Sequence, residues 1–183
     1  MISRRSVLLC AATLVSISLA AVAAAPPADP CGNPDLVSQG YTMVPATVLA
    51  VESGDRLRVR VDAAKYTPTA LVGTYAVRLV ATEAPASGTD AAEQSRARLS
   101  ARLLGKDVQL MLSPFQQRGT PRNMIVQGPK PDLADENLGQ IAAGMARAVE
   151  QGAYDVDWYM RCTYRRAEES AKSAALGIWA APH

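Results

Sequence analysis

Between residues 56 and 61 the chain alternates strictly between apolar and charged side chains. The apolar positions are Leu57, Val59 and Val61, and the charged positions are Arg56, Arg58 and Arg60. A period of two residues is typical of a strand with one buried and one solvated face. Residues 47–51 are also rich in β-branched side chains, and Ser53-Gly54-Asp55 has the composition of a turn. The sequence therefore predicts that a hairpin, or the start of a meander, opens the fold.

Further strands and three helices are expected along the rest of the chain. Strands are predicted over 75–81, 108–112 and 123–127. Helices are predicted over 90–104, from Asp135 to about 149, and from Asp155 or Asp157 to about 175. Gly105, Gly152 and Gly177 follow these helices and favour their ends. This order is that of an α+β fold, with enough strands to close a small barrel.

The composition excludes some kinds of catalytic and metal site. The chain has 183 residues, 49% of them hydrophobic and 20% charged, which suits one globular domain. The one histidine is the terminal His183, so a histidine-based catalytic triad or histidine metal cluster within the fold is excluded. The three cysteines are widely spaced, which excludes a zinc ribbon and a CxxC redox site.

The N-terminal segment, residues 1–23, has the pattern of a signal peptide. Arg4 and Arg5 precede a long apolar stretch, and Ala21-Val22-Ala23 offers a cleavage site. The arginine pair also resembles a twin-arginine export signal. We therefore expect export to the periplasm or the medium, with no membrane contact after cleavage; the alternative is an uncleaved anchor. Residues 24–43 then form a tail rich in proline and glycine.

Export changes the charge balance and the state of the cysteines. Removing residues 1–23 takes away two arginines and no acid, so the formal charge of +2 belongs to the signal. A neutral mature chain is a poor candidate for tight, nonspecific binding of long nucleic acids. Cys31 and Cys162 remain, and in an oxidising compartment we expect them to pair. Two free buried thiols are the alternative.

Six short motifs follow one another in an order that is similar to a known family. They are Gly54-Asp55; Val77-Arg78-Leu79 with Glu83-Ala84-Pro85; Leu103-Leu104-Gly105-Lys106; Pro121-Arg122; Asp135 to Ala146; and Ala167 to Trp179. Over residues 44–181 the chain resembles the staphylococcal-nuclease-like (thermonuclease) family. The resemblance implies a five-stranded OB-fold barrel with three helices. We expect a monomer.

The resemblance also implies a chemistry, namely calcium-assisted hydrolysis of phosphodiester bonds. The family's metal ligands fall on Asp55 and Glu83, and its phosphate-binding arginines fall on Arg78 and Arg122. Its general base, a glutamate, falls on Ala86, whose methyl group cannot accept a proton. Loss of a general base typically costs about 10²–10⁴-fold in rate.

Other positions also depart from the family's pattern. Ser53 replaces an acid of the first turn, and Arg56 replaces its threonine, where it could bind a ligand. Glu83 stands where the family has an aspartate, which would displace the metal ion. Glu93 or Asp90 could in principle supply a substitute base.

Three functions are therefore open at this point. The first is a degenerate nuclease-like module that binds a nucleotide, a single-stranded nucleic acid or a protein. The second is an active, calcium-dependent endonuclease with a rearranged base. The third is a structural protein of the cell envelope. Convergent arginines without a base favour the first, a carboxylate facing the Arg78–Arg122 pocket favours the second, and arginines held in internal ion pairs favour the third.

Overall fold

The computed structural model describes residues 29–32, 41–63, 71–112, 123–149 and 157–180. Its strands are β1 (Thr42–Ser53), β2 (Arg56–Val61), β3 (Gly73–Leu79), β4 (Thr82–Glu83), β5 (Asp107–Leu112), β6 (Asn123–Gln127) and β7 (Arg147–Ala148). Its helices are α1 (Asp90–Leu103), α2 (Glu136–Ala142) and α3 (Trp158–Ser173), followed by the short 3₁₀ helix η4 (Gly177–Trp179).

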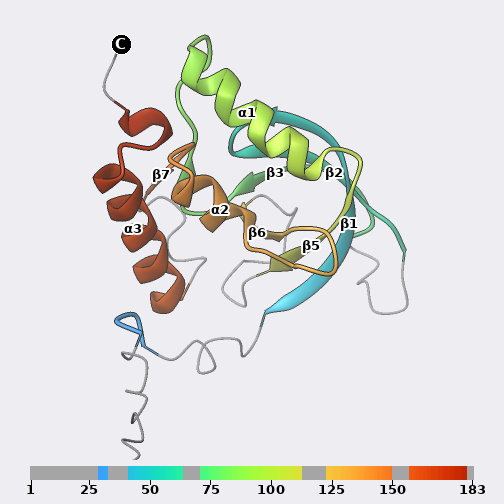
Figure 1. Cartoon of the computed structure of the whole chain (residues 1–183). Helices are drawn as coiled ribbons and strands as arrows, with labels where there is room; N and C mark the ends of the chain where they lie inside the picture. The colour runs from blue at the N-terminus through green and yellow to red at the C-terminus, as the bar shows by residue number, and fades with distance from the viewer. Residues whose placement is uncertain (1–28, 33–40, 64–70, 113–122, 150–156, 181–183) are drawn as a thin grey trace, which may run out of the picture.

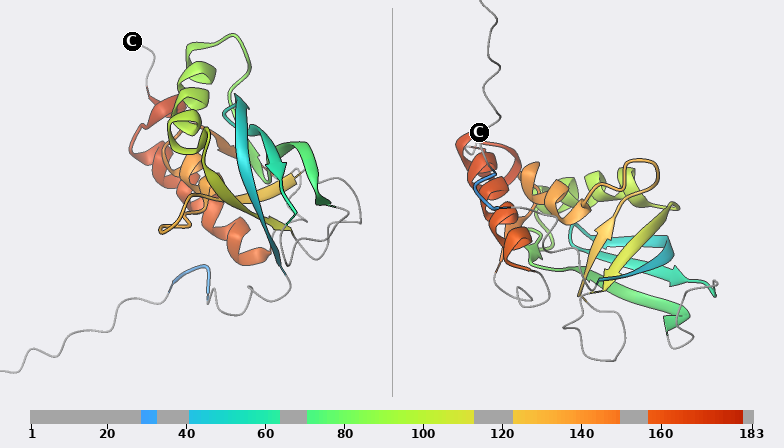
Figure 2. Two further views of the ribbon diagram at one scale, coloured as in Figure 1. Left: turned by 90° about the vertical axis from the view of Figure 1, so that its right-hand side faces the viewer. Right: turned by 90° about the horizontal axis from the view of Figure 1, so that it is seen from below.

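Five of the strands close into a barrel in the order β1-β2-β3-β6-β5. Strands β3 and β6 run parallel and the other neighbours antiparallel. β1 spans 12 residues and pairs with β5 through its first half and with β2 through its second, with register shifts along the way. Figures 1 and 2 show it curving around the barrel. The predicted α+β fold, an OB-fold-like five-stranded barrel with three helices, is confirmed.

The inner face of the barrel is the face that the alternation of β2 predicts. Leu57, Val59 and Val61 are buried, whereas the three arginines between them are exposed. Leu99 and Leu103 bring α1 into the same core cluster and so close one end of the barrel. Burial of each such side chain stabilises the fold by about 1.5–3 kcal/mol. A second cluster holds α2 and α3 against the outside of β5 and β6 (Figure 1).

The second helix is shorter than the sequence predicts, because it ends at Ala142 rather than near residue 149. Gly144 adopts a positive φ of 67°, and its carbonyl accepts a hydrogen bond from the amide of Ile178 at 2.9 Å. A Cβ atom at Gly144 would overlap the carbonyl of Leu176. This close backbone approach turns the chain out of the helix, and the next residues form β7.

Two smaller boundaries also differ from expectation. The third strand ends at Leu79 instead of Ala81, because Val80 and Ala81 form a turn into β4, in which Ala81 takes a positive φ of 52°. The third helix is capped by Asp157, one of the two predicted caps, whose side chain accepts from the amide of Met160 at 2.9 Å.

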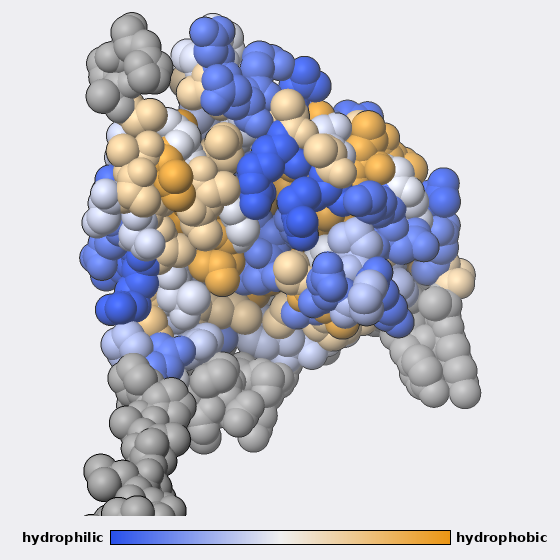
Figure 3. Space-filling view, in the orientation of Figure 1, coloured by the Kyte–Doolittle hydropathy of each residue, from blue (hydrophilic) through white to orange (hydrophobic). Residues whose placement is uncertain are grey.

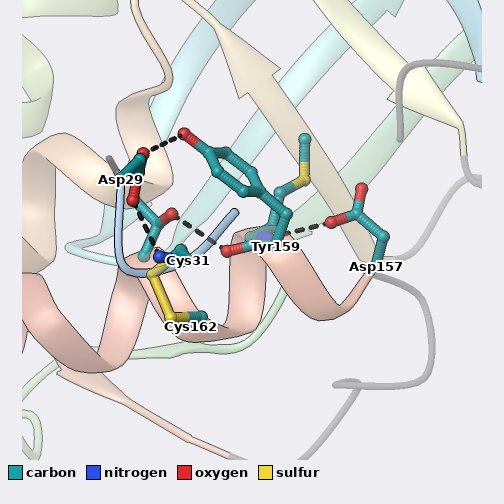
Figure 4. Close-up of a disulfide and its surroundings, with 7 residues drawn as sticks. Asp29, Cys31, Asp157, Tyr159 and Cys162 are labelled. Carbon is teal, nitrogen blue, oxygen red and sulfur yellow. Dashed lines mark hydrogen bonds between the residues drawn. A yellow bond between two sulfur atoms is a disulfide. The ribbon is translucent and has the colours of Figure 1, made fainter. Parts of the chain in front are cut away.

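Cys31 and Cys162 form the predicted disulfide (Figure 4). Cys31 and Cys162 have their Cα atoms 5.6 Å apart, across a sequence separation of 131 residues. Asp29 supports this link twice, since its carboxylate accepts from the amide of Cys31 at 2.8 Å and from the hydroxyl of Tyr159 at 3.0 Å. The disulfide therefore attaches residues 29–32 to the first turns of α3.

No helix in the part of the chain that the structure describes is long and apolar enough to cross a membrane. The predicted signal peptide, residues 1–23, lies outside the described residues, as does most of the predicted tail.

Candidate functional site

The turn between β1 and β2 positions Asp55 against β3. Gly54 packs so closely on α1 that a Cβ atom there would overlap the hydroxyl of Ser95. The carbonyl of Asp55 accepts from the amide of Leu79 at 2.8 Å, which joins the turn to the end of β3. Asp55 itself is buried. The sequence places an acid here because a short polar side chain suits the turn.

Both carboxylate oxygens of Asp55 already have partners. Oδ2 accepts from Nε of Arg78 at 3.0 Å, and Oδ1 accepts from the hydroxyl of Ser53 at 2.6 Å. The Arg78 side chain is 27% exposed, so the ion pair lies at the edge of the surface. A guanidinium held through Nε keeps its two terminal nitrogens for another acceptor. Among the described residues, none accepts from these nitrogens of Arg78.

Arg56 lies directly across from Arg78 in the antiparallel β2–β3 ladder. Directly opposed residues in such a ladder project from the same face of the sheet. Arg56 is exposed and makes no hydrogen bond or ion pair through its side chain to a described residue. Arg58 and Arg60, further along β2, are instead paired with Glu52 at 2.7 Å and Asp62 at 3.0 Å. Within the described chain, the arginines of this face that have available donors are therefore Arg56 and Arg78, at the turn end of β2 and the facing end of β3.

The remaining predicted positions are less closely joined to this pair. Glu83 is exposed in β4, where it stands opposite Arg147 of β7. Ala86 is exposed in the segment before α1, and its carbonyl accepts from the hydroxyl of Thr89, the N-cap of that helix, at 2.9 Å. Arg122 lies outside the described residues. It directly precedes Asn123, the first residue of β6, which pairs with Arg78.

The two candidate substitute bases differ in their surroundings. Glu93 is exposed and paired with Arg96 at 2.7 Å, in the first turn of α1. Asp90 is exposed at the start of the same helix and has no described ion pair. Neither side chain is linked to Asp55 or Arg78 by a contact among the described residues.

The donor set around Asp55 is a poor fit for calcium. Ca²⁺ usually takes six to eight oxygen ligands. Within the described ranges, no three acidic, cysteine or histidine side chains gather into a possible metal site. The Asp55 carboxylate is already compensated by Arg78 and Ser53. Calcium binding therefore stays a prediction of the resemblance.

A buried polar network supports the turn from beneath, and sequence reasoning missed it. Nε2 of Gln140 donates to the carbonyl of Gly54 at 2.8 Å and to that of Ser95 at 3.1 Å. Its Oε1 accepts from Arg98 at 2.6 Å. Burial lowers the pKa of Arg98, and the charge of nearby Glu136 partly offsets this. Gln140 is fully buried, and a polar residue beside Ile141 on the inner side of α2 was the available signal.

Comparison of the chain with models of protein families gave no match, and comparison with curated proteins gave none. The likeness to the staphylococcal-nuclease-like family thus rests on the motifs in the sequence. A barrel of this class supports many activities, so the function has to be argued from the site.

Proposed function

We propose that this protein is an exported, nuclease-like binding protein that holds a phosphate group of a nucleotide or single-stranded nucleic acid without efficient hydrolysis. The observation that carries the proposal is the placement of Arg56 opposite Arg78, with Asp55 holding Arg78 through Nε. Two adjacent guanidinium groups with free donors suit a phosphate, because each can bind its oxygens in a bidentate manner.

Asp55 acts here as a positioning residue for Arg78. A salt bridge that is mostly shielded from water restricts the rotamers of the arginine, so less conformational entropy is lost when the phosphate binds. The terminal nitrogens of Arg78 then face the same side of the sheet as Arg56. In this arrangement Asp55 neutralises part of the local positive charge and does not contact the ligand.

The absence of hydrolysis follows from Ala86. Its methyl group replaces the carboxylate that would accept a proton from the attacking water. Asp90 favours the alternative of an active endonuclease, because this candidate base is an exposed carboxylate without a described ion pair. The Asp55–Arg78 ion pair favours the structural alternative, because Nε of Arg78 binds a carboxylate of the protein itself.

A binding assay separates these possibilities. The ligand is a short, fluorescent, 5′-phosphorylated oligothymidylate, and its polarisation is measured with the disulfide-bonded protein in the presence of a chelator. We expect binding that Arg56→Gln weakens by about tenfold, the usual scale for one charge-assisted contact. Arg60→Gln is the matched control, because Arg60 lies on the same strand but is paired with Asp62.

A cleavage assay with the same oligonucleotide runs alongside, with and without calcium, for the native chain and Ala86→Glu. Binding without cleavage by the native chain supports the proposal. Calcium-dependent cleavage by the native chain supports the endonuclease, and Glu93→Gln and Asp90→Asn then test its base. Failure of the oligonucleotide to bind, or equal losses in Arg56→Gln and Arg60→Gln, contradicts the phosphate site and leaves the structural alternative.

A further inference from the structure

Hydrogen bonds hold the peptide groups on both sides of the Asp55 Cα atom. The carbonyl of Gly54, in the peptide group before Asp55, accepts from Nε2 of Gln140 at 2.8 Å. The carbonyl of Asp55, in the peptide group after it, accepts from the amide of Leu79 at 2.8 Å. Because peptide groups are planar, fixing these two oxygens restricts the φ and ψ angles of Asp55. The direction of the Asp55 side chain, and with it the bond to Nε of Arg78, therefore depends on both contacts.

The orientation of the Gln140 amide is fixed by its other partners. Its Oε1 accepts from Nη1 of Arg98 at 2.6 Å, and its Nε2 also donates to the carbonyl of Ser95 at 3.1 Å. A guanidinium can only donate hydrogen bonds, so the amide oxygen faces Arg98 and the amide nitrogen faces Gly54. Gln140 is fully buried. A hydrogen bond lost here is therefore not replaced by one to solvent.

The polar contacts continue from Arg98 towards the surface between α1 and α2. The charge of Glu136 stabilises the half-buried guanidinium of Arg98, and Glu136 also accepts from Nη2 of Arg102 at 2.6 Å. The Arg102 side chain is 42% exposed. Figure 3, which has the orientation of Figure 1, shows hydrophilic residues in blue over the boundary between these two helices. A charged Arg98 gives Gln140 a charge-assisted hydrogen bond, which is stronger than one between neutral groups.

We propose that Gln140 is a positioning residue of the phosphate site: it fixes the peptide group before Asp55, and Asp55 in turn holds Arg78 for the ligand. This inference rests on the phosphate site proposed above and adds to it a residue from a different element, α2. Gln140 is buried beneath the turn and does not touch the ligand. Its effect on binding passes through the peptide group that it holds and through the preorganised side chain of Arg78.

Gln140→Met tests the proposal, because methionine has a similar length and no hydrogen-bond donor. The first readout is the Nε–Hε signal of Arg78 in ¹⁵N spectra of the disulfide-bonded protein, assigned by its loss in Arg78→Lys. We expect this signal to shift towards the position of solvent-exposed arginines. Affinity for the 5′-phosphorylated oligothymidylate should fall by about three- to tenfold, the scale for one side chain that is no longer held.

Tyr164→Phe is the control, because it removes one buried hydrogen bond, to Asp135, in the second core cluster. We expect neither the Arg78 signal nor the affinity to change in this variant. Arg98→Leu is a second test variant, at a half-buried position, and it removes the partner of Oε1 while Gln140 stays. The Arg78 signal should shift in the same direction as in Gln140→Met, because the amide can then rotate away from Gly54.

Three outcomes would overturn the proposal. One is an unchanged Arg78 signal in both test variants, and another is an equal shift in Tyr164→Phe. The third is a shifted signal with unchanged affinity, which would make the role of Gln140 purely structural. A native chain that does not bind the oligothymidylate would contradict the phosphate site itself. The Arg78 signal would then still decide separately whether Gln140 fixes Asp55.

Discussion

Asp55 is a turn residue, a buried acid and a salt-bridge partner at once. Its backbone carbonyl ties the β1–β2 turn to Leu79, while its carboxylate holds Arg78 and accepts from Ser53. A buried carboxylate is tolerated only when its oxygens are satisfied in this way. The residue thus links local stability to the orientation of the proposed phosphate site.

Replacement of Asp55 by asparagine should therefore affect both stability and binding. We expect the free energy of unfolding to fall by about 1–2 kcal/mol, because the partly exposed Arg78 loses its charged partner but can still reach water. Oligonucleotide affinity should fall as well, since Arg78 is no longer held. Denaturant unfolding and polarisation measure the two effects. Asp62→Asn, which breaks the exposed pair with Arg60, is the control and should cost less than about 1 kcal/mol; equal losses would contradict the role of burial.

Asp135 is a half-buried acid at the start of α2. It caps α2 through the amide of Leu138 and accepts from the hydroxyl of Tyr164 at 2.8 Å. Burial raises its pKa above the ordinary value of 3.8, against the effect of these hydrogen bonds. Burial likewise raises the pKa of Tyr164 well above 10.

The raised pKa predicts the sign of a pH effect. The folded state binds the Asp135 proton more readily than the unfolded state, so the native chain gains stability as the pH falls through the raised pKa towards 3.8. Asp135→Asn keeps an acceptor for Leu138 and Tyr164 but cannot titrate. We expect the stability of the native chain relative to this variant to rise on acidification from pH 7 to pH 4. Urea unfolding at both pH values tests this, and a constant difference would contradict it.

At the scale of elements, the end of α2 is determined by a contact with η4. Gly144 and Gly177 approach each other backbone to backbone, and a Cβ atom at either would overlap a carbonyl of the other segment. Both residues have positive φ angles, of 67° and 52°. This contact, together with the disulfide to Cys31, joins the C-terminal helices to the rest of the chain.

Gly144→Ala should consequently destabilise the protein by about 2–4 kcal/mol, because strain at a positive φ adds to the overlap with the carbonyl of Leu176. Gly88→Ala is the matched control: its φ is 84°, but no atom lies within 4 Å of the added methyl group. This control carries only the conformational strain, about 1 kcal/mol. Thermal or denaturant unfolding measures both variants, and similar losses would show that the close approach contributes nothing.

At the scale of the whole molecule, ion pairs with acids compensate several of the arginines. Among the described residues, Arg58, Arg60, Arg96 and Arg102 are all held in ion pairs with acids. Because Arg58 and Arg60 are compensated by Glu52 and Asp62, the available positive charge at Arg56 does not continue along β2. The proposed ligand is correspondingly one that presents one or two phosphates.

This distribution predicts a weak dependence of binding on salt. Each phosphate of a single strand that is neutralised contributes about −0.7 to the slope of log K against log salt concentration. Two contacts, at Arg56 and Arg78, should thus give a slope no steeper than about −1.4. Polarisation titrations of the oligothymidylate at several salt concentrations measure it. A slope steeper than about −3 would mean that the contacts extend well beyond these two arginines.

The sequence by itself determined the elements whose pattern is local. The alternation of β2 depends on which side chains can be buried, and the Asp157 cap depends on one side chain and the next amides, so both are readable without the fold. The pairing of Cys31 with Cys162 was also predictable, because these are the two cysteines that lie outside the predicted signal peptide.

Tertiary structure alone decided where α2 ends, which partner Arg78 takes and how Gln140 supports the turn. The end of α2 depends on Gly177, far along the chain, and the pairing of Arg56 with Arg78 depends on the register between two strands. Such contacts join residues that no local period relates. The amino-acid sequence therefore predicts the strands and the helix caps. The arrangement of polar groups around a site follows only from the register and packing of the closed barrel.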